Sequence, residues 1–147
     1  MKDSAIHKVA ALPYRLTPEG VMSVLLVTSR RSRRWIVPKG HLETGYTPWD
    51  MAAREAYEEA GVMGTISSRL LGCFTYRKVL ESGAISTSSV QLFALAVGRE
   101  LEDWPERDSR RRQWFKVVDA IAAVEQEDLR EIMLAFAGRV ADGRFAY

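Results

Sequence analysis

The chain has 147 residues, of which 47% are hydrophobic and 27% are charged, so it can form one hydrophobic core and is not a largely disordered protein. Its net charge of +2 is too small to indicate a nucleic-acid or membrane partner. No apolar run approaches the roughly 20 residues that span a bilayer, and the N-terminus lacks the apolar segment of a secretory signal. The single cysteine, Cys73, excludes an internal disulfide and fits a reducing compartment. We therefore expect one domain over residues 1–147 that acts in the cytoplasm without a membrane partner, with Cys73 in its core.

Apolar, β-branched runs separated by turn residues predict strands along most of the chain. The expected strands are residues 6–16, 21–28, 35–38, 65–78, 84–97 and 113–118. Pro13 predicts a sheet edge or a bulge in the first strand, which forms a hairpin with the second. A last helix is expected to begin at Asp119 or Glu125 and to end at Arg139. It carries apolar residues at spacings of three and four, which predict core packing. These residues are Leu129, Ile132, Met133 and Phe136. With a further helix in mid-chain, the pattern predicts an α+β domain.

The mid-chain helix carries the most informative charges in the sequence. Thr47 suits an N-cap, Pro48 the first helical position, and Gly61 the left-handed residue that closes a helix. Between them, three carboxylates fall within an arc of about 100° on the helix surface. They are Glu55, Glu58 and Glu59. Carboxylates this close repel one another unless a cation lies between them, and a hard divalent ion such as Mg²⁺ or Mn²⁺ meets that need. The alternative is a solvated acidic face with Arg54 paired to Glu58.

The same stretch resembles the Nudix box, G-x5-E-x7-R-E-U-x-E-E-x-G-U, in which U is a bulky aliphatic residue. The matching positions are Gly40, Arg54, Glu55, Glu58, Glu59, Gly61 and Val62. Two positions depart from the pattern, since Tyr46 stands in place of the first glutamate and Ala56 is a small version of U. The resemblance implies an α/β/α sandwich with a mixed sheet. It also implies that the helix glutamates bind metal, and Tyr46 is expected to weaken that binding or to reposition Arg54.

A wider similarity covers residues from about 8 to 121. The segments W-I-V-P at 35–38, L-E-D-W at 101–104, W-F-K at 114–116 and D-A-I at 119–121 are similar to those of diphosphoinositol-polyphosphate phosphohydrolases. That group also hydrolyses diadenosine polyphosphates. This chain has Lys39-Gly40-His41 where the group has three glycines, and its loop between residues 78 and 86 differs. The similarity implies hydrolysis of a pyrophosphate linkage in a highly phosphorylated small molecule.

Roles for the box residues follow from their chemistry. Glu55 and Glu59 are the leading metal ligands, and Glu58 is a third ligand or the base for the attacking water. A backbone carbonyl at Lys39 or Gly40 is expected to supply a further ligand, because glycine allows close backbone approach. Arg54 is expected to orient Glu58 rather than to touch substrate.

Substrate phosphates require positive charge outside the metal shell. The candidates for this role are Lys8, Arg15, Lys39, His41, Arg77, Lys78 and Arg112, the last from the run at 110–112. The arginines at 30, 31, 33 and 34 form either a solvated loop or a funnel for polyanions. His7 is expected at the surface, and Trp49 and Trp104 in packing roles rather than as stacking platforms.

Three functions remain open from the sequence. We favour the metal-dependent pyrophosphohydrolase of a polyphosphorylated small molecule, with no nucleic acid bound. The first alternative is an enzyme that acts on a nucleotide or on the 5′ end of RNA. The second is a weakened Nudix-like sensor of a phosphorylated ligand, for which Tyr46 is the support. The sequence is compatible with a monomer or a homodimer.

Overall fold

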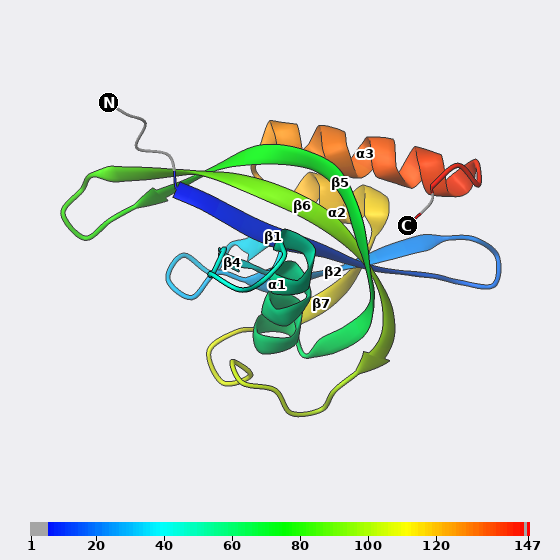
Figure 1. The fold of residues 1–147 in the computed structure, drawn as a ribbon, viewed down its shortest axis with the longest axis horizontal. Coiled ribbons are helices and arrows are strands. Elements are labelled where there is room, and N and C mark those ends of the chain that lie inside the picture. Colours follow the sequence, from blue (N-terminus) through cyan, green and yellow to red (C-terminus); the bar gives the residue numbers. More distant parts are fainter. Residues whose placement is uncertain (1–5, 146) are drawn as a thin grey trace.

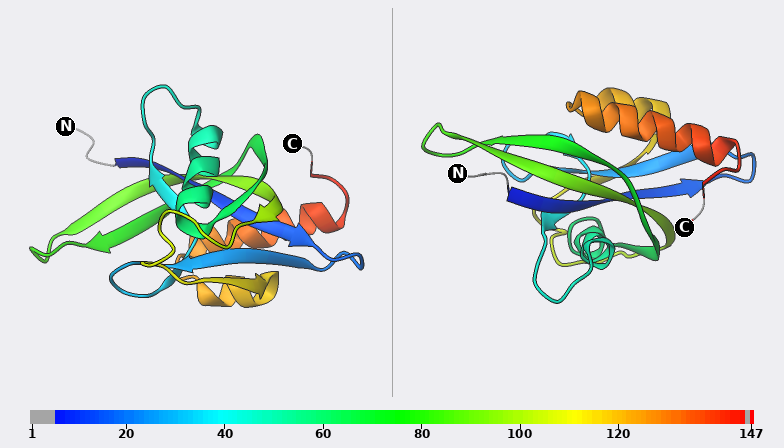
Figure 2. Two further views of the ribbon diagram at one scale, coloured as in Figure 1. Left: turned by 90° about the horizontal axis from the view of Figure 1, so that it is seen from below. Right: turned by 45° about the horizontal axis from the view of Figure 1, so that its top comes forward.

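The computed structural model describes residues 6–145 and Tyr147. It contains one sheet with helices on both faces (Figure 1). The strands are β1 (Ile6–Leu16), β2 (Met22–Thr28), β3 (Trp35–Ile36), β4 (Lys39–His41), β5 (Val62–Val79), β6 (Ile85–Glu100) and β7 (Arg112–Lys116). The helices are α1 (Pro48–Glu55), its π-helical continuation η1 (Ala56–Ala60), α2 (Val117–Ala123) and α3 (Glu127–Ala141). Figure 2 shows α1 on one side of the sheet and α3 on the other. The predicted α+β class and its layered arrangement are therefore confirmed.

The sheet is mixed, with the strand order β3-β2-β1-β6-β5, while β4 pairs with β1 and β7 with β2. Strand β1 lies in the middle of this order and runs parallel to β6. The other pairings are antiparallel, including the long β5–β6 hairpin that extends away from the body of the domain (Figure 1). Because β4 joins β1 directly, the loop that leads into α1 starts at the centre of the sheet.

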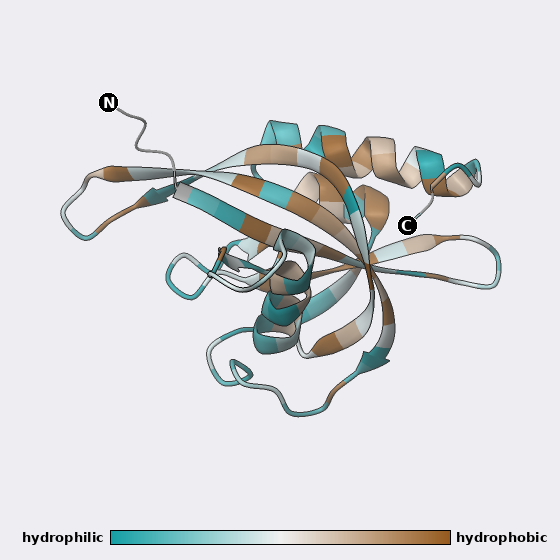
Figure 3. Ribbon diagram, in the orientation of Figure 1, coloured by the Kyte–Doolittle hydropathy of each residue, from teal (hydrophilic) through white to brown (hydrophobic). Residues whose placement is uncertain are grey.

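Two hydrophobic layers hold the helices to the sheet. Successive side chains of a strand point to opposite faces, so Val9 and Ala11 pack with α1 whereas Ala10 and Leu12 pack with α2 and α3. Burial on both faces explains why the central strands are continuously apolar. Figure 3 shows this hydrophobic colouring on the central strands, while the loop between β6 and β7 is largely hydrophilic.

The box helix, which consists of α1 and η1, begins as its sequence predicts but ends in a wider turn. The Thr47 side chain accepts a hydrogen bond from the Asp50 N–H at 3.1 Å, and Pro48 is the first helical residue. Its last five residues form the π turn η1, and Gly61 closes it with a φ of 66°. A left-handed φ of this kind suits glycine, so the predicted C-terminus is confirmed.

The C-terminal helical region differs from the single helix that was expected. Two helices, α2 and α3, are separated at Val124, whose extended backbone (φ −83°, ψ 152°) interrupts the helix. The predicted core face is confirmed, because Leu129, Met133 and Phe136 are buried and Ile132 is partly buried. The interruption lets α2 and α3 pack against each other and against the sheet.

Two expectations about single residues are wrong. Pro13 is buried in a central strand rather than at an edge; it lies between the β1 residues paired with β4 (Lys8–Ala10) and those paired with β2 (Tyr14–Leu16). A proline is tolerated there because the antiparallel ladder is already interrupted. Cys73 is exposed rather than buried. It follows the register shift at Leu70/Gly72, a shift that reverses which face each side chain takes.

Substitution by alanine is expected to change the free energy of unfolding in opposite directions at Gly64 and Gly138. A Cβ at Gly64, which lies beside a bulge in β5, would overlap the Ala96 carbonyl oxygen, whereas none of the described atoms comes within 4 Å of a Cβ at Gly138 in α3. Gly64→Ala is therefore expected to lower the free energy of unfolding by about 2 kcal/mol or more. Gly138→Ala is expected to raise it by about 0.5–1 kcal/mol, because alanine restricts the unfolded chain. Urea unfolding of both variants checks these signs, and equal effects would contradict the bulge geometry.

Candidate functional site

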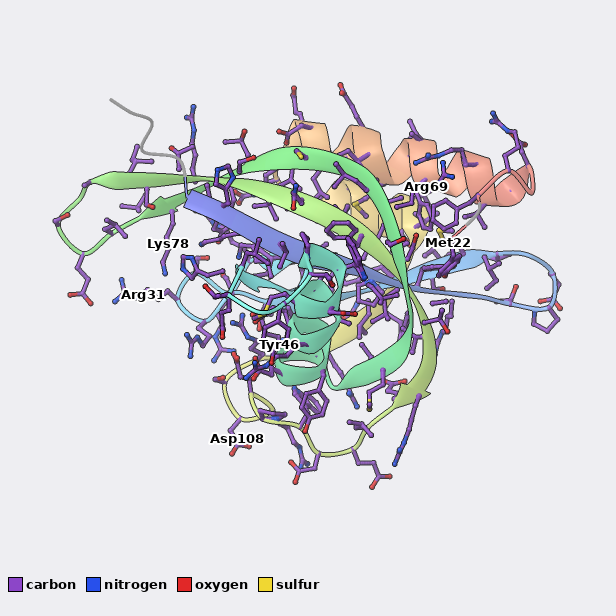
Figure 4. All side chains as sticks on the ribbon, in the orientation of Figure 1. Met22, Arg31, Tyr46, Arg69, Lys78 and Asp108 are labelled. Carbon is purple, nitrogen blue, oxygen red and sulfur yellow. The ribbon has the colours of Figure 1, made fainter. Side chains whose placement is uncertain are left out.

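A cleft of about 600 Å³ lies between the β2–β3 loop, strand β4, the C-terminal half of the box helix and the outer end of β5. Its lining consists of Lys8, Ser29, Arg30, Arg31, Ser32, Arg34, Ile36, Lys39, Gly40, His41, Glu43, Glu55, Glu59, Tyr76, Arg77, Lys78, Val79, Glu106 and Arg110. Eight of these residues are lysines or arginines and four are glutamates, so the cleft is strongly polar and cationic. In Figure 4, Arg31 and Lys78 lie at the same end of the molecule, beside the β5–β6 hairpin.

Two glutamates of the box form the acidic part of this cleft. Glu55 ends α1 and Glu59 lies four residues later in η1, so both point to the same side; their exposed fractions are 8% and 4%. Burial and the neighbouring Glu59 raise the pKa of Glu55 to about 8. Burial also raises the pKa of Glu59, against the opposing effect of the Arg110 and Lys39 charges. Close, buried carboxylates of this kind favour the uptake of a proton or a cation.

The backbone of β4 lies directly against these carboxylates. The Lys39 N–H donates to Glu59 Oε1 at 3.2 Å. A Cβ at Gly40 would come within 2.6 and 2.7 Å of the two carboxylate oxygens of Glu55. Only glycine leaves room for this approach, which accounts for the fixed glycine of the motif.

Arg110 is the cation closest to the acidic pair, and its side chain is only 9% exposed. Its guanidinium lies 3.5 Å from Glu59, donates to Glu106 at 2.7 Å and donates to the Thr28 carbonyl at 3.0 Å. The sequence placed Arg110 only within a basic run and gave no role to Glu106. No local pattern separates Arg110 from its neighbours, because the folded loop before β7 decides which arginine turns inward.

Glu58 is not among the residues that line the cleft. Its carboxylate lies 3.4 Å from Arg54 Nε in the expected i, i+4 pair, and Arg54 in turn donates to the Tyr46 hydroxyl at 2.5 Å. Arg54 therefore contacts Glu58 as the sequence reasoning expected. The structure brings Glu55 and Glu59 together and leaves Glu58 beside them.

Five of the predicted substrate-binding residues line the cleft, although they come from three separate strands. They are Lys8 from β1, Lys39 and His41 from β4, and Arg77 and Lys78 from β5. The ammonium of Lys39 lies 3.8 Å from the centre of the Tyr76 ring, and that of Lys8 lies 5.7 Å from it. Burial lowers the pKa of Lys39 to about 8. Burial and then the Lys78 charge lower the pKa of Lys8. These cations are crowded and partly desolvated, as a site for an anion requires.

Arg15 and Arg112 do not line this cleft, so the structure does not bring them together with the other five predicted substrate-binding residues. Arg112 donates to the carbonyls of Ala60, Gly61 and Leu101 at 2.9, 3.3 and 2.6 Å and lies 3.9 Å from the Trp104 ring centre. It thus stabilises the end of η1, where the carbonyls lack helical partners. Arg15 lies over the Trp114 ring, 3.9 Å from its centre.

The two tryptophans that were expected to pack do so. Trp104 donates to the Glu59 carbonyl at 3.0 Å. Trp49 contacts Phe93 edge to face, with ring centres 6.3 Å apart. The predicted surface position of His7 is also confirmed.

The arginine-rich loop between β2 and β3 forms one wall of the cleft. Arg30, Arg31 and Arg34 line it, whereas Arg33, with a φ of 57°, does not. Arg34 pairs with Glu125 at 2.9 Å, and Arg31 contacts Glu81 at the tip of the β5–β6 hairpin. The loop therefore faces a common space with Arg77 and Lys78, the arrangement that a funnel for polyanions needs.

The donor set fits a hard divalent cation. Mg²⁺ is usually bound through one or two carboxylates, with water and substrate phosphates completing its shell. The paired Glu55 and Glu59 supply such carboxylates, and burial, followed by the neighbouring Glu59 charge, raises the pKa of Glu55. Across residues 6–145 and Tyr147, no group of three His, Cys, Asp or Glu side chains is placed to hold a metal ion.

Comparison with known proteins gives the family. The NUDIX domain family matches residues 7–136. Mouse (Mus musculus) diphosphoinositol polyphosphate phosphohydrolase 3-alpha is 41% identical over 121 residues, covering 80% of this chain and 68% of the relative. Nudix hydrolase 12, mitochondrial, of Arabidopsis thaliana is 35% identical over 126 residues, covering 84% and 62%. The chain therefore belongs to the NUDIX family, whose named relatives include hydrolases and phosphohydrolases. The match spans about two thirds of the length of these relatives.

Solved structures confirm the Nudix fold. A C. elegans Ap4A hydrolase binary complex superposes with a TM-score of 0.69 and 22% identity, covering 94% of this chain and 99% of that one. A NUDIX hydrolase from Nitrosomonas europaea gives a TM-score of 0.69 and 20% identity, covering 97% of each chain. None of the helices within the described residues has the length and apolar character of a membrane span.

Glu55 predicts a pH dependence for the stability of the metal-free protein. Its pKa is about 8 in the folded protein against an ordinary value of 4.5. Between these values the folded state binds more protons than the unfolded state, so the free energy of unfolding falls as the pH rises through this window. Glu55→Gln is expected to flatten this part of the profile. Urea unfolding in EDTA at about pH 5 and about pH 8 measures it, with the exposed Glu102→Gln as a control. A wild-type slope in Glu55→Gln would contradict the assignment.

Proposed function

We propose that this chain is a metal-dependent pyrophosphohydrolase of a highly phosphorylated small molecule, either a diphosphoinositol polyphosphate or a diadenosine polyphosphate. The observation that carries the proposal is the buried Glu55–Glu59 pair in a cleft walled by eight lysines and arginines. The volume of about 600 Å³ lies within the range of small-molecule sites. The names of two relatives, a diphosphoinositol polyphosphate phosphohydrolase and an Ap4A hydrolase, support the substrate class.

Glu55 and Glu59 are the proposed ligands of Mg²⁺ or Mn²⁺, with a backbone carbonyl at Lys39 or Gly40 beside them. When bound, the cation supplies charge neutralisation at the phosphate oxygens and lowers the pKa of a coordinated water. The chain positions these carboxylates. Because Gly40 has no side chain, the backbone of β4 lies close to Glu55, and the Arg110 guanidinium lies 3.5 Å from Glu59.

The cationic walls are proposed to hold the phosphates on either side of the scissile linkage. Lys8 and Lys39 come from the centre of the sheet and lie next to Glu59, whose charge acts on the pKa of both. Arg77 and Lys78 lie farther out along β5. A substrate that reaches both groups carries phosphates at more than one end, and Arg side chains suit such oxygens through paired hydrogen bonds.

Two carboxylates are candidates for accepting the proton of the attacking water. Glu58 belongs to the box helix but is paired with Arg54 beside the cleft. Glu106 lines the cleft and is bound by Arg110 at 2.7 Å. A base must lie within hydrogen-bond reach of the water, directly or through one more water, so both candidates require a test.

We further propose that residues 1–147 act as one Nudix domain in the cytoplasm, as a monomer or a homodimer. The NUDIX match over residues 7–136 supports the single domain. An exposed Cys73 fits a reducing compartment, where thiols stay unpaired.

Loss of a proposed metal ligand is expected to remove most activity. Glu59→Gln takes away one carboxylate of the pair, and kcat should fall at least about 100-fold because several kcal/mol of transition-state stabilisation depend on the cation. Chromatographic product analysis with Mg²⁺ checks this on a diphosphoinositol polyphosphate, diadenosine penta- and hexaphosphate, ADP-ribose, a nucleoside triphosphate and a 5′-triphosphate RNA. Glu102→Gln, an exposed glutamate outside the cleft, is the matched control.

The panel separates the alternatives. Cleavage of the first three substrates supports the proposal. Cleavage of RNA or mononucleotide alone would contradict the proposed substrate class but would still support hydrolysis of a pyrophosphate linkage. Binding of the polyphosphates without any turnover would favour a sensor of phosphorylated ligands.

The β5 cations are expected to act on substrate binding. Arg77→Ala and Lys78→Ala should each raise KM by about three- to tenfold with a smaller change in kcat, because a phosphate contact outside the reacting centre is made in both ground and transition states. The effect should shrink as salt is added, since exposed charges are screened. Arg69→Ala, an exposed arginine that lies beside α3 in Figure 4, is the control. An unchanged KM in both variants would remove β5 from the site.

A further inference from the structure

The ring of Tyr76 lies beneath the ammonium group of Lys39 in the cleft. Tyr76 is the only Phe, Tyr or Trp among the described residues that line the cleft. Lys39 Nζ lies 3.8 Å from the centre of the Tyr76 ring, and an atom in the ring plane cannot come so close, because the edge of the ring intervenes. The ammonium therefore covers one face of the ring, as a cation–π contact requires.

The Tyr76 ring is held in position by the core of the domain. Tyr76 is partly buried and packs against both hydrophobic layers. Its backbone pairs with Ser88 of β6 in the long hairpin, which fixes the strand that carries it. A flat ligand such as a nucleobase needs an open ring face, and the core and the Lys39 ammonium compete with it for that face.

Lys39 is anchored in turn by its own backbone. It pairs with Ala10 of β1, and its N–H donates to Glu59 Oε1 at 3.2 Å. The ammonium of Lys8, on the neighbouring strand, lies 5.7 Å from the same ring centre, so one ring attracts two cations. The negative face of the ring offsets part of the repulsion between them. Moving the Lys39 ammonium away from the ring would remove this compensation.

Position 39 is also one at which the chain differs from the group that it resembles. That group has three glycines where this chain has Lys39-Gly40-His41. A glycine at position 39 would leave the face of the Tyr76 ring uncovered. Stacking on an open aromatic face raises the affinity for a nucleobase by about tenfold or more. Whether the ring is a stacking surface thus depends on the side chain at position 39.

We propose that Lys39 and Tyr76 are a specificity-determining pair of the cleft: the ammonium covers the ring, so the site holds a substrate through its phosphates and does not stack a nucleobase on Tyr76. The proposal rests on the proposed binding of a polyphosphorylated substrate in this cleft. It implies that the adenines of a diadenosine polyphosphate gain nothing from the only large aromatic ring among the described residues of the lining.

The test compares diadenosine pentaphosphate with inorganic pentaphosphate, two ligands with the same number of phosphates, of which only the first carries bases. Calorimetric titration in EDTA, which removes the cation required for turnover, gives the ratio of their dissociation constants. Lys39→Ala uncovers the ring and should shift this ratio about tenfold in favour of diadenosine pentaphosphate. Tyr76→Leu alone should leave the ratio unchanged, because no base lies on the ring of the wild type.

Double variants show whether the shift comes from the ring. Lys39→Ala/Tyr76→Leu should lose the shift, whereas Lys39→Ala/Tyr76→Phe should keep it, because phenylalanine retains the ring face. Lys78→Ala is the matched control: it removes another lysine of the same cleft, so both ligands should lose affinity equally. Both ligands are titrated into the same preparation, and the ratio is therefore independent of the fraction of folded protein.

The outcomes separate this inference from the proposed function. An unchanged ratio in Lys39→Ala would overturn the inference, and so would a wild-type preference for diadenosine pentaphosphate that Tyr76→Leu removes. Both results leave the hydrolase proposal intact, since turnover with Mg²⁺ decides it. A wild type that binds both ligands but hydrolyses no polyphosphate would refute the hydrolase proposal, and the ratios would still decide the inference. Absence of binding by the wild type would overturn both.

Discussion

Two carboxyl groups held together out of water constrain this site more than any other feature. Glu55 and Glu59 are nearly buried on one turn of the box helix, and ionisation of both opposes folding unless positive groups compensate it. The chain compensates it in part, through the Arg110 guanidinium and the Lys39 N–H, both of which contact Glu59. Apolar residues on the same side of the helix, Met51 and Ala52 one turn before Glu55, pack into the core and hold this side of the helix against the sheet.

The cations of the cleft also lie in surroundings that disfavour their charged forms. Burial lowers the pKa of Lys39 to about 8 and raises that of Glu55 to a similar value, so both side chains lie in surroundings that disfavour their charged forms. Binding of the proposed divalent cation and phosphate between them would relieve both penalties. Charges fixed before the ligand arrives require little reorganisation during a reaction, which is the main electrostatic advantage of a preformed site.

The sequence predicted the position of a residue where that position depends on neighbouring residues in the chain, and it did not where the position depends on residues far away in the chain. Thr47, Pro48 and Gly61 define the ends of the box helix through neighbouring backbone groups, so the sequence predicted them. The paired Glu55 and Glu59 follow from helical spacing alone. Arg110 and Arg112 differ in role because the loop before β7 turns one toward Glu59 and the other toward the end of η1. Their sequence surroundings are nearly identical, so only long-range packing separates them. Pro13 and Cys73 were misplaced for the same reason, since strand order and a register shift lie outside local sequence.

The parallel pairing of β1 with β6 has a consequence for biosynthesis. Ile6 pairs with Ser88, about 80 residues later in the chain, and contacts of such long range form slowly because a large loop must close. While the ribosome is still making β5, the first strand has only its antiparallel neighbours, and the sheet that carries Lys8 is incomplete. The acidic helix and its cationic walls are therefore assembled late, after most of the domain has emerged. Until then the arginine-rich loop and the helix glutamates are not yet joined with Lys8 in one cleft.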